Sequence, residues 1–214
     1  MNFKKAIEVF RNPKLSIFLL GSASSGYLRD IGWVNSFNKK IPVDVNGGAV
    51  PWVTYPFIDF IKDRLCGVDK LFEYGSGNST FFYSSYVVAV YAVEHDADWY
   101  EYISKKVPDN VSVSFESLEV NGAYCRRAAT SGNKYDLIVV DGRDRVNCVV
   151  NSLGALSDKG VIVLDDSERD RYQEAIIFML DNGFRKIDFW GVSPGLLYKK
   201  NTTIFYRDGN ALGI

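Results

Sequence analysis

The sequence predicts an α/β protein built on an open, doubly wound, mostly parallel seven-stranded sheet with helices on both faces. Three observations predict this fold class. From Lys70 onward, short apolar runs of strand length alternate with segments of helical periodicity. The runs at residues 135–140 and 161–164 are continuously apolar, as in strands buried on both faces of a parallel sheet. The last two predicted strands leave no room for a crossover helix, so we expect a terminal antiparallel hairpin.

Each element follows from a local pattern. Strands are predicted at residues 71–74, 87–93, 111–115, 135–140, 161–164, 184–190 and 202–206. Helices are predicted at residues 79–85, 98–106, 146–156 and 171–181, with another beginning near Pro56 and a short amphipathic one at 2–10. Asp158-Lys159-Gly160 is read as a turn, and Asn182-Gly183 as a helix stop.

The regularity of the sequence pattern changes near residue 55. Residues 1–55 are irregular and are interpreted as an N-terminal extension or lid packed on the core, whereas residues 56–214 form the main domain. The aromatic side chains of Trp33, Trp52 and Tyr55 fit either a lid or ordinary core packing. We expect a substrate pocket to be built from residues 20–56 and the loop 191–200, or from a partner subunit, which would make the protein a homodimer.

Bulk properties narrow the function classes. The 214 residues are 47% hydrophobic and 24% charged with a net charge of −1, which fits one globular domain. No basic stripe favours a nucleic-acid partner. The apolar run at residues 15–20 is too short to span a membrane, and Glu8 ahead of it argues against a signal peptide. Three scattered cysteines suggest neither disulfides nor zinc, so we expect reduced thiols and a cytoplasmic location.

The sharpest local signal is the loop Glu73-Tyr74-Gly75-Ser76-Gly77-Asn78-Ser79, which follows the first strand. Glycines at two positions let a ligand approach the backbone, and N–H groups at the start of the next helix can bind an anionic group. The alternative is a plain turn. The loop lacks the third glycine of the dinucleotide fingerprint, and no Gly-Lys-Ser/Thr follows it.

Acidic residues stand at the ends of four predicted strands, namely Glu73, Glu94, Asp141, and Asp165 with Asp166. In an open α/β sheet, ligands bind beyond these carboxyl ends. Glu94 lies about twenty residues after the glycine loop, where an acidic side chain can accept hydrogen bonds from two ribose hydroxyls. Its alternative role is that of an exposed helix-capping carboxylate.

The segments 72–79, 93–96, 136–141 and 160–166 together resemble the Rossmann-like, S-adenosylmethionine-dependent methyltransferase family. The resemblance covers roughly residues 56–207 and includes the terminal hairpin. It implies S-adenosylmethionine as cofactor, with the methionine end near the glycine loop, the ribose on Glu94 and the adenine beside residues 116–118. The implied cofactor-binding residues are Glu73, Gly75, Ser76, Gly77, Ser79, Glu94, His95, Ser117 and Asp141. Asn78-Ser79 stands where another glycine is common in that family.

A second constellation lies at the later strand ends. Asp141, Asp165 and Asp166 can converge on a hard divalent cation such as Mg²⁺, which prefers oxygen ligands. In this respect the chain is similar to catechol-type O-methyltransferases, although those have Asp-Asn where this chain has Asp165-Asp166. The metal would acidify the acceptor hydroxyl, with Asp141 and Asp165 as catalytic residues. Alternatively, Asp141 contacts the cofactor's amine or acts as a base, and Asp166 caps the following helix.

The function predicted from the sequence is S-adenosylmethionine-dependent methylation, with an oxygen of a small molecule or sugar as the acceptor. Arg143 and Arg145 could hold an acidic acceptor, or they could pair with Asp144 and Asp170 at the surface. Two other functions stay open. One is a non-catalytic module that binds S-adenosylmethionine or a nucleotide, and the other is an NAD(P)-dependent oxidoreductase, which the truncated fingerprint and the final hairpin disfavour.

Overall fold

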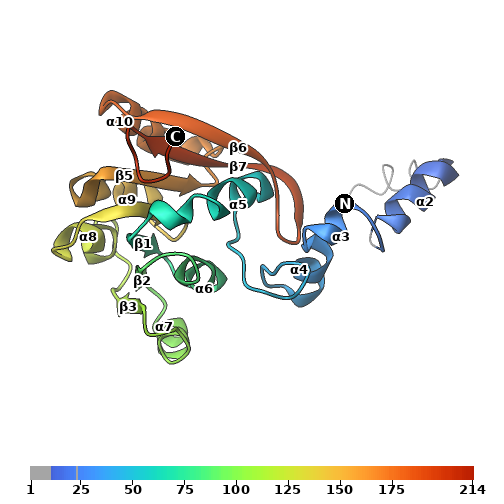
Figure 1. Ribbon diagram of the computed structural model, residues 1–214, viewed down its shortest axis with the longest axis horizontal. Helices are drawn as coiled ribbons and strands as arrows, with labels where there is room; N and C mark the ends of the chain where they lie inside the picture. The colour runs from blue at the N-terminus through green and yellow to red at the C-terminus, as the bar shows by residue number, and fades with distance from the viewer. Residues whose placement is uncertain (1–10, 23) are drawn as a thin grey trace.

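A computed structural model describes residues 11–22 and 24–214 and places seven strands in one sheet, in the order β3-β2-β1-β4-β5-β7-β6 (Figure 1). The strands are β1 Lys70–Tyr74, β2 Ala89–Glu94, β3 Val111–Phe115, β4 Tyr135–Val140, β5 Leu156–Asp165, β6 Arg185–Ser193 and β7 Leu196–Tyr206. The first five run parallel, whereas β7 is antiparallel to both β5 and β6. The predicted α/β class, strand number and closing hairpin are therefore confirmed.

The chain leaves the sheet edge after β3 and returns at β4, on the other side of β1. The strand order thus reverses between β1 and β4. Connections from these two strands leave in opposite directions, which opens a crevice beyond their carboxyl ends. The crevice places the loop after β1 opposite the loop after β4.

Nine α-helices lie in the described part of the chain. They are α2 Pro13–Gly21, α3 Tyr27–Asp30, α4 Trp33–Lys39, α5 Tyr55–Lys62, α6 Asn78–Ser84, α7 Ala97–Ser104, α8 Ala123–Thr130, α9 Arg145–Ser152 and α10 Gln173–Asp181. Helix α8 has no counterpart among the predicted helices, because Arg126 and Arg127 interrupt its few buried residues, Tyr124, Cys125 and Ala128. The helix predicted at residues 2–10 lies outside the described residues.

Two apolar clusters cover the two faces of the sheet. Along β4, Leu137 and Val139 belong to one cluster, whereas Ile138 and Val140 belong to the other. Helices α5 and α6 contribute to the first cluster, and α8, α9 and α10 contribute to the second. The alternation explains the continuously apolar strands, since successive side chains point to opposite faces and both faces are covered.

The turn predicted at Asp158-Lys159-Gly160 is wrong, because β5 runs through it. The pairing of β5 with β4 is irregular opposite residues 135–137, and Gly160 lies at this irregularity. A Cβ at Gly160 would come within 2.9 Å of the carbonyl oxygen of Tyr135. The glycine is therefore required by close packing of two strands, which is a common use of glycine inside a strand.

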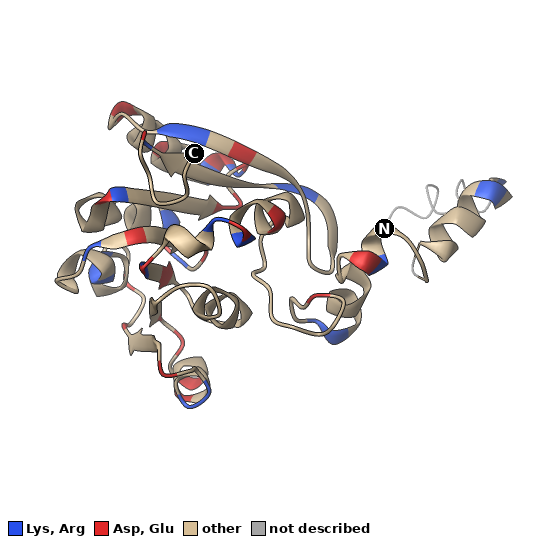
Figure 2. Cartoon of the chain, viewed as in Figure 1, with Lys and Arg blue, Asp and Glu red and all other residues tan. Residues whose placement is uncertain are grey.

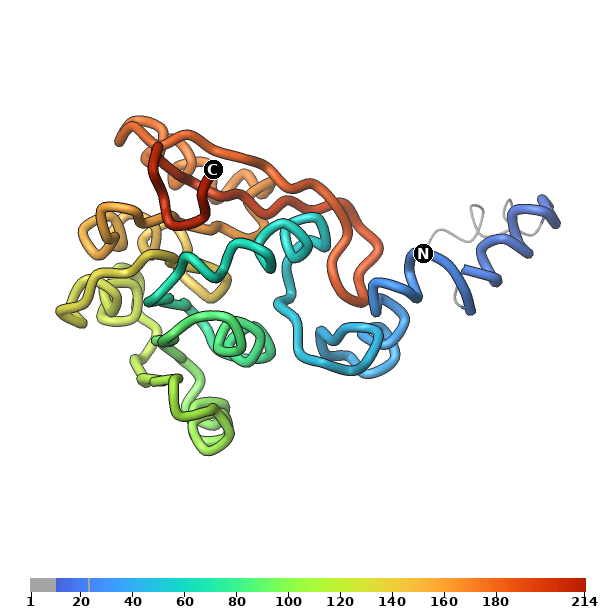
Figure 3. The backbone as a smooth tube through the Cα atoms, viewed as in Figure 1, coloured from blue at the N-terminus to red at the C-terminus, as the bar shows by residue number. Residues whose placement is uncertain are grey.

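The segment from α4 to α5 packs against the β6-β7 hairpin. The indole N–H of Trp33 donates to the carbonyl of Leu196 at 3.0 Å, and that of Trp52 donates to the carbonyl of Pro194 at 2.8 Å. Charged residues of both signs occur along the body of the molecule (Figure 2). Farther toward the N-terminus, α2 extends away from the sheet as an arm (Figure 3). Within residues 11–22 and 24–214, no helix is long and apolar enough to cross a bilayer.

Candidate functional site

The glycine loop joins β1 to α6 at the crevice. Gly75 has a φ of +96°, a conformation that side-chain-bearing residues rarely adopt, and its N–H donates to the carbonyl of Val93 at 2.9 Å. The loop is thereby tied to the end of β2. The hydroxyl of Thr80 accepts a hydrogen bond from the N–H of Gly77 at 3.0 Å, which holds the second half of the loop.

Glu73 lies beneath the loop and is 2% exposed. Its Oε2 accepts a hydrogen bond of 2.6 Å from the hydroxyl of Thr80, so a chain of two bonds links Glu73 to the N–H of Gly77. Burial raises the pKa of Glu73 to about 7, because a carboxylate loses its hydration inside the protein. Near neutral pH the side chain therefore exchanges between a charged and a neutral form.

The raised pKa of Glu73 predicts a pH-dependent stability. The folded protein binds this proton more tightly than the unfolded chain, whose ordinary value is 4.5, so stability falls as the pH rises from 4.5 through 7. Relative to a Glu73→Gln variant, wild-type protein should lose on the order of 3 kcal/mol of unfolding free energy over this range. Urea denaturation of both proteins at four pH values would measure it. Parallel curves would contradict the prediction.

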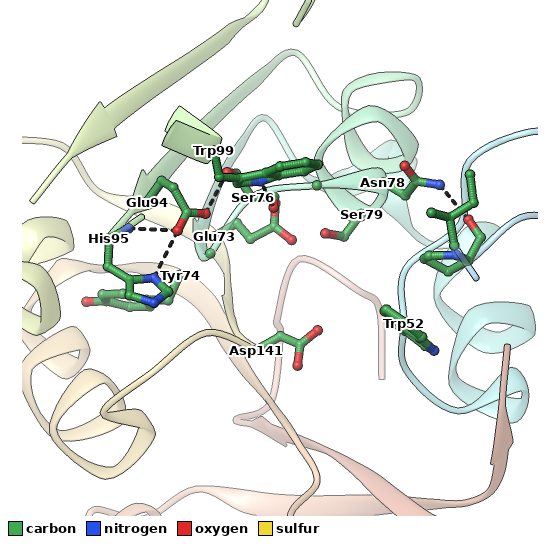
Figure 4. A pocket seen from close by; sticks show the side chains of 14 residues that line it. Trp52, Glu73, Tyr74, Ser76, Asn78, Ser79, Glu94, His95, Trp99 and Asp141 are labelled. Carbon is green, nitrogen blue, oxygen red and sulfur yellow. Dashed lines mark hydrogen bonds and ion pairs between the residues drawn. The ribbon is translucent and has the colours of Figure 1, made fainter. Parts of the chain in front are cut away.

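Glu94 ends β2 and is held by its surroundings. Its Oε1 accepts from the backbone N–H groups of His95 at 2.8 Å and Asp96 at 3.0 Å, and its Oε2 accepts from the hydroxyl of Ser76 at 2.8 Å (Figure 4). The Nδ1 atom of His95 lies 2.9 Å from the same carboxylate. The side chain of Glu94 is thus oriented before any ligand binds, at the place where the sequence predicts a ribose contact.

Trp99 is a residue that the sequence reasoning missed. Its indole N–H donates to the carbonyl of Ser76 at 2.9 Å, which places the ring beside the glycine loop and Glu94 (Figure 4). Asp96 caps α7 by accepting from the N–H of Trp99 at 2.9 Å. The helix predicted at residues 98–106 already has Trp99 in its first turn, but no local pattern indicates that the indole reaches the glycine loop.

These groups surround a cavity of about 290 Å³ beyond β1, β2 and β4. Its lining comprises Ile41, Pro42, Trp52, Glu73, Tyr74, Gly75, Ser76, Gly77, Asn78, Ser79, Glu94, His95, Trp99 and Asp141. Every cofactor-binding residue predicted from the sequence therefore lies on one cavity, with the exception of Ser117. Ser117 follows β3, is exposed and does not line this cavity.

A second cavity of about 330 Å³ adjoins the first and shares Trp52 and Asp141 with it. Its other lining residues are Asp165, Asp166, Arg169, Leu196, Tyr198 and Lys200. This agrees with the expectation of a pocket built from residues 20–56 and 191–200. Of the three aromatic residues proposed for the wall, Trp33 and Tyr55 are buried in the core, and only Trp52 reaches the cavities.

Asp141 occupies the junction of the two cavities. Its Oδ1 accepts from Nη2 of Arg145 at 2.9 Å, and no hydrogen bond from the described residues reaches its Oδ2. The pKa of Asp141 is raised well above its usual value by burial and by the nearby charge of Asp165, against the opposing effects of Arg145 and Lys200. Asp141 therefore has one restrained oxygen and one oxygen available to a ligand.

Two buried cations lie among the carboxylates at the ends of β4 and β5. The ammonium of Lys200 is 2.7 Å from Oδ2 of Asp165 and 2.9 Å from Oδ1 of Asp166. The Nη1 atom of Arg145 is 3.3 Å from Oδ2 of Asp166, and Asp165 also accepts from the hydroxyl of Thr202 at 2.7 Å. Three carboxylates, counting Asp141, are thus paired with two internal cations.

No protein-family model matches the chain, and no curated protein matches its sequence. Solved structures do match. A structure from Staphylococcus aureus, provisionally described as a caffeoyl-CoA O-methyltransferase, is 14% identical, covers 91% of this chain and 99% of its own, and has a TM-score of 0.56. The chain has the Rossmann-like fold of S-adenosylmethionine-dependent methyltransferases.

Other structures with this methyltransferase fold act on different acceptors. Precorrin-6y C5,15-methyltransferase from Geobacter metallireducens is 14% identical, with coverage of 78% of this chain and 98% of its own and a TM-score of 0.55. An rRNA methylase from Streptococcus thermophilus is 12% identical, with coverage of 73% and 99% and a TM-score of 0.51. The fold alone therefore does not identify the acceptor.

The side chains around Asp141, Asp165 and Asp166 do not fit the divalent cation that the sequence predicts there. The ammonium of Lys200 already lies within 3 Å of both Asp165 and Asp166. Burial alone would raise the pKa of Asp166, but Lys200, followed by Arg145 and Arg169, lowers it below its usual value. A metal ion would have to displace these cations to reach the carboxylates.

Arg145 has neither of the two roles predicted from the sequence, which were holding an acidic acceptor and pairing with an aspartate at the surface. Its guanidinium faces inward and is buried, pairing with Asp141 and Asp166, so it neither holds a ligand at the surface nor pairs with Asp144 or Asp170. Asp144 instead accepts from the N–H of Asn121 at 2.8 Å. The helix-capping alternative for Asp166 is also wrong, since its side chain pairs with Lys200, Arg145 and Arg169.

Proposed function

We propose that the protein is an S-adenosylmethionine-dependent methyltransferase that transfers a methyl group to a hydroxyl oxygen of a small molecule or sugar. The observation that carries the proposal is the pair of adjoining cavities with Asp141 between them. Methyl transfer needs a cofactor and an acceptor side by side, with the reacting atoms held in line. A single nucleotide-binding pocket would not require the second cavity.

The side chains and backbone that line the first cavity match the chemical groups of the cofactor. Glu94 presents a carboxylate that can accept hydrogen bonds from ribose hydroxyls, and Trp99 offers a ring face beside it. Gly77 would carry a Cβ into open space, so a ligand can approach the backbone of the loop there. Glu73 lies at the other end, where its carboxyl group suits the ammonium of an amino acid.

The second cavity is assigned to the acceptor. When bound, the cofactor supplies an electrophilic methyl carbon on a sulfonium. Oδ2 of Asp141 would accept the proton that the acceptor hydroxyl loses when its oxygen takes up the methyl group. Lys200 and Arg145 keep Asp165 and Asp166 neutralised beside this step, so that Asp165 has a supporting role and Asp141 acts as the base.

Oxygen is favoured as the acceptor atom for two reasons. A base with a raised pKa matches removal of a proton from a hydroxyl group, and the caffeoyl-CoA neighbour is described as an O-methyltransferase. Trp52 and Tyr198 line the second cavity and are 41% and 49% exposed, so each can present a ring face to a sugar or an aromatic acceptor. The charges of the lining aspartates are balanced by Lys200, Arg169 and the neighbouring Arg145, which suits an uncharged, hydroxyl-rich ring.

Calorimetric titration with S-adenosylhomocysteine, NAD and NADP tests the proposed cofactor directly. Heat of binding with S-adenosylhomocysteine alone is the expected result. Preferential binding of NAD or NADP, or the absence of any binding, would overturn the proposal. A tritiated-methyl transfer assay over a panel of glycosides and phenols would then identify the acceptor.

Glu94→Ala should weaken binding of S-adenosylhomocysteine by on the order of 1–3 kcal/mol, because the ribose hydroxyls lose charge-assisted hydrogen bonds. Glu101→Ala is the matched control. Glu101 lies on α7, its side chain is exposed, it is not among the cavity residues, and its ion-pair partner is Lys105 at 3.9 Å. Equal affinities for the two variants would remove Glu94 from the cofactor site. Circular dichroism would verify that both variants are folded.

A further inference from the structure

Helix α2 is apolar and fully outside the core. None of its residues, Pro13–Gly21, is buried. Its large apolar side chains are Leu15, Ile17, Phe18, Leu19 and Leu20, and their exposed fractions range from 40% to 76%. A surface helix of a globular protein normally turns one apolar stripe toward the core. Here the apolar residues surround the helix and none of them is buried, so the described fold leaves an apolar surface on α2 exposed.

The arm carries this helix away from the catalytic body. Figure 1 shows α2 extended beyond α3 and α4, on the side of the molecule remote from the sheet. The two cavities lie at the carboxyl ends of β1, β2, β4 and β5, and none of their lining residues comes from α2. The helix is therefore separate from the site assigned to methyl transfer.

Charge is distributed unequally between the first forty residues and the rest of the chain. The first forty residues contain seven basic residues, Lys4, Lys5, Arg11, Lys14, Arg29, Lys39 and Lys40, and two acidic residues, Glu8 and Asp30. Their net charge is therefore +5. Because the whole chain has a net charge of −1, residues 41–214 have a net charge of −6. Figure 2 shows basic positions at the outer end of α2 and on α4.

We propose that α2 docks this protein onto an anionic lipid bilayer. Apolar side chains around a short helix fit insertion among acyl chains, and basic residues on either side of it fit acidic headgroups. A nucleic acid would match the charge but not Ile17, Phe18 and Leu20. A second copy of the chain would match the apolar surface but would bring together two N-terminal segments, residues 1–40, each with a net charge of +5.

The size of the helix sets the mode of contact. Nine residues span roughly 13 Å, less than half of the hydrocarbon thickness of a bilayer, so α2 enters one leaflet and does not cross it. The acidic body is repelled from an anionic surface while the arm is attracted to it. The arm therefore determines which side of the molecule faces the membrane.

Flotation of the full-length protein with lipid vesicles tests this docking. Vesicles of phosphatidylcholine with 30% phosphatidylglycerol should carry the protein to the top of a gradient at low salt, whereas pure phosphatidylcholine should bind it at least tenfold more weakly. The variant Ile17→Asp/Phe18→Asp should lose binding. Arg11→Glu/Lys14→Glu should weaken binding to the anionic vesicles on the order of tenfold or more, because each basic residue near the surface contributes to attraction.

Val120→Asp is the matched control, since Val120 is 87% exposed and lies far along the chain in the loop before α8. Its binding should equal that of wild-type protein. Equal binding of Ile17→Asp/Phe18→Asp and wild type would overturn the proposal. So would a dimer in light scattering without lipid that this variant converts to a monomer, because α2 would then be an interface between copies. Affinity for S-adenosylhomocysteine, measured on the same variants, should not change, which separates this test from that of the proposed function.

Discussion

Asp141→Asn is expected to lower kcat for methyl transfer by about 10²–10⁴-fold, the usual contribution of a general base. Asparagine has nearly the same shape and can still accept the hydrogen bond that Arg145 donates to Oδ1. It cannot accept a proton at the position of Oδ2. The affinity for S-adenosylhomocysteine should change much less than kcat, because the loss falls on the reacting proton.

The pH profile distinguishes a base from a residue that only shapes the cavity. Burial and the charge of Asp165 raise the pKa of Asp141, so the deprotonated, active form is present only above that raised value. The rate constant kcat/KM of the wild-type enzyme should therefore increase with pH through this pKa. In Asp141→Asn the acidic limb should vanish. An unchanged acidic limb, or a loss of less than about fivefold in kcat, would assign the base to another group.

Lys200→Met is expected to destabilise the protein by about 3–5 kcal/mol, because it removes one partner from a buried ion cluster. The side chain of Lys200 is 4% exposed, and its ammonium lies within 3 Å of the carboxylates of Asp165 and Asp166. Methionine fills a similar volume without the charge. The loss would be measured as a change in the midpoint of urea denaturation with an unchanged slope.

Lys199→Met is the control for this substitution. Lys199 is the neighbouring residue, is exposed and lies over the ring of Trp190 at 4.3 Å, so its replacement should change stability by less than about 1 kcal/mol. Equal destabilisation by the two variants would show that the charge of Lys200 does not stabilise the folded protein through the ion cluster.

Lys200→Met also tests whether the ammonium of Lys200 occupies the place that a divalent ion would need. If Lys200 takes the position that a divalent ion would need, wild-type protein should bind Mn²⁺ weakly or not at all in electron paramagnetic resonance titrations. Lys200→Met exposes Asp165 and Asp166 without their ammonium and should gain affinity for Mn²⁺. Tight binding of Mn²⁺ by wild-type protein, abolished by Asp166→Asn, would restore the metal hypothesis.

The local features of the site could be predicted from the sequence. Glu73 is the penultimate residue of β1 and Glu94 is the last residue of β2, and parallel strands bring their carboxyl ends to one edge. The position of such a residue depends only on recognising its own strand, so the loop 73–79 and Glu94 were placed together correctly on one cavity. The terminal hairpin could be predicted for the same reason.

The partners of Asp165 depended on the tertiary structure. Asp165 pairs with Thr202 in the register between β5 and β7, which brings Lys200 beside it from thirty-five residues farther along the chain. A strand's sequence does not specify its register against a distant strand, and a slip of one residue would turn Lys200 to the opposite face. Three carboxylates at strand ends therefore suggested a metal site, although two cations fill their surroundings.

The sequence by itself thus determined the fold class, the glycine loop and the carboxylates at the strand ends, since each follows from hydrophobic period and local turn chemistry. Only the tertiary structure decided which charges meet, that Trp99 stands at the loop, and that the apolar run at residues 15–20 remains outside the core. Pairing and burial are relations between distant segments. They are set by packing, and no local pattern in the chain records them.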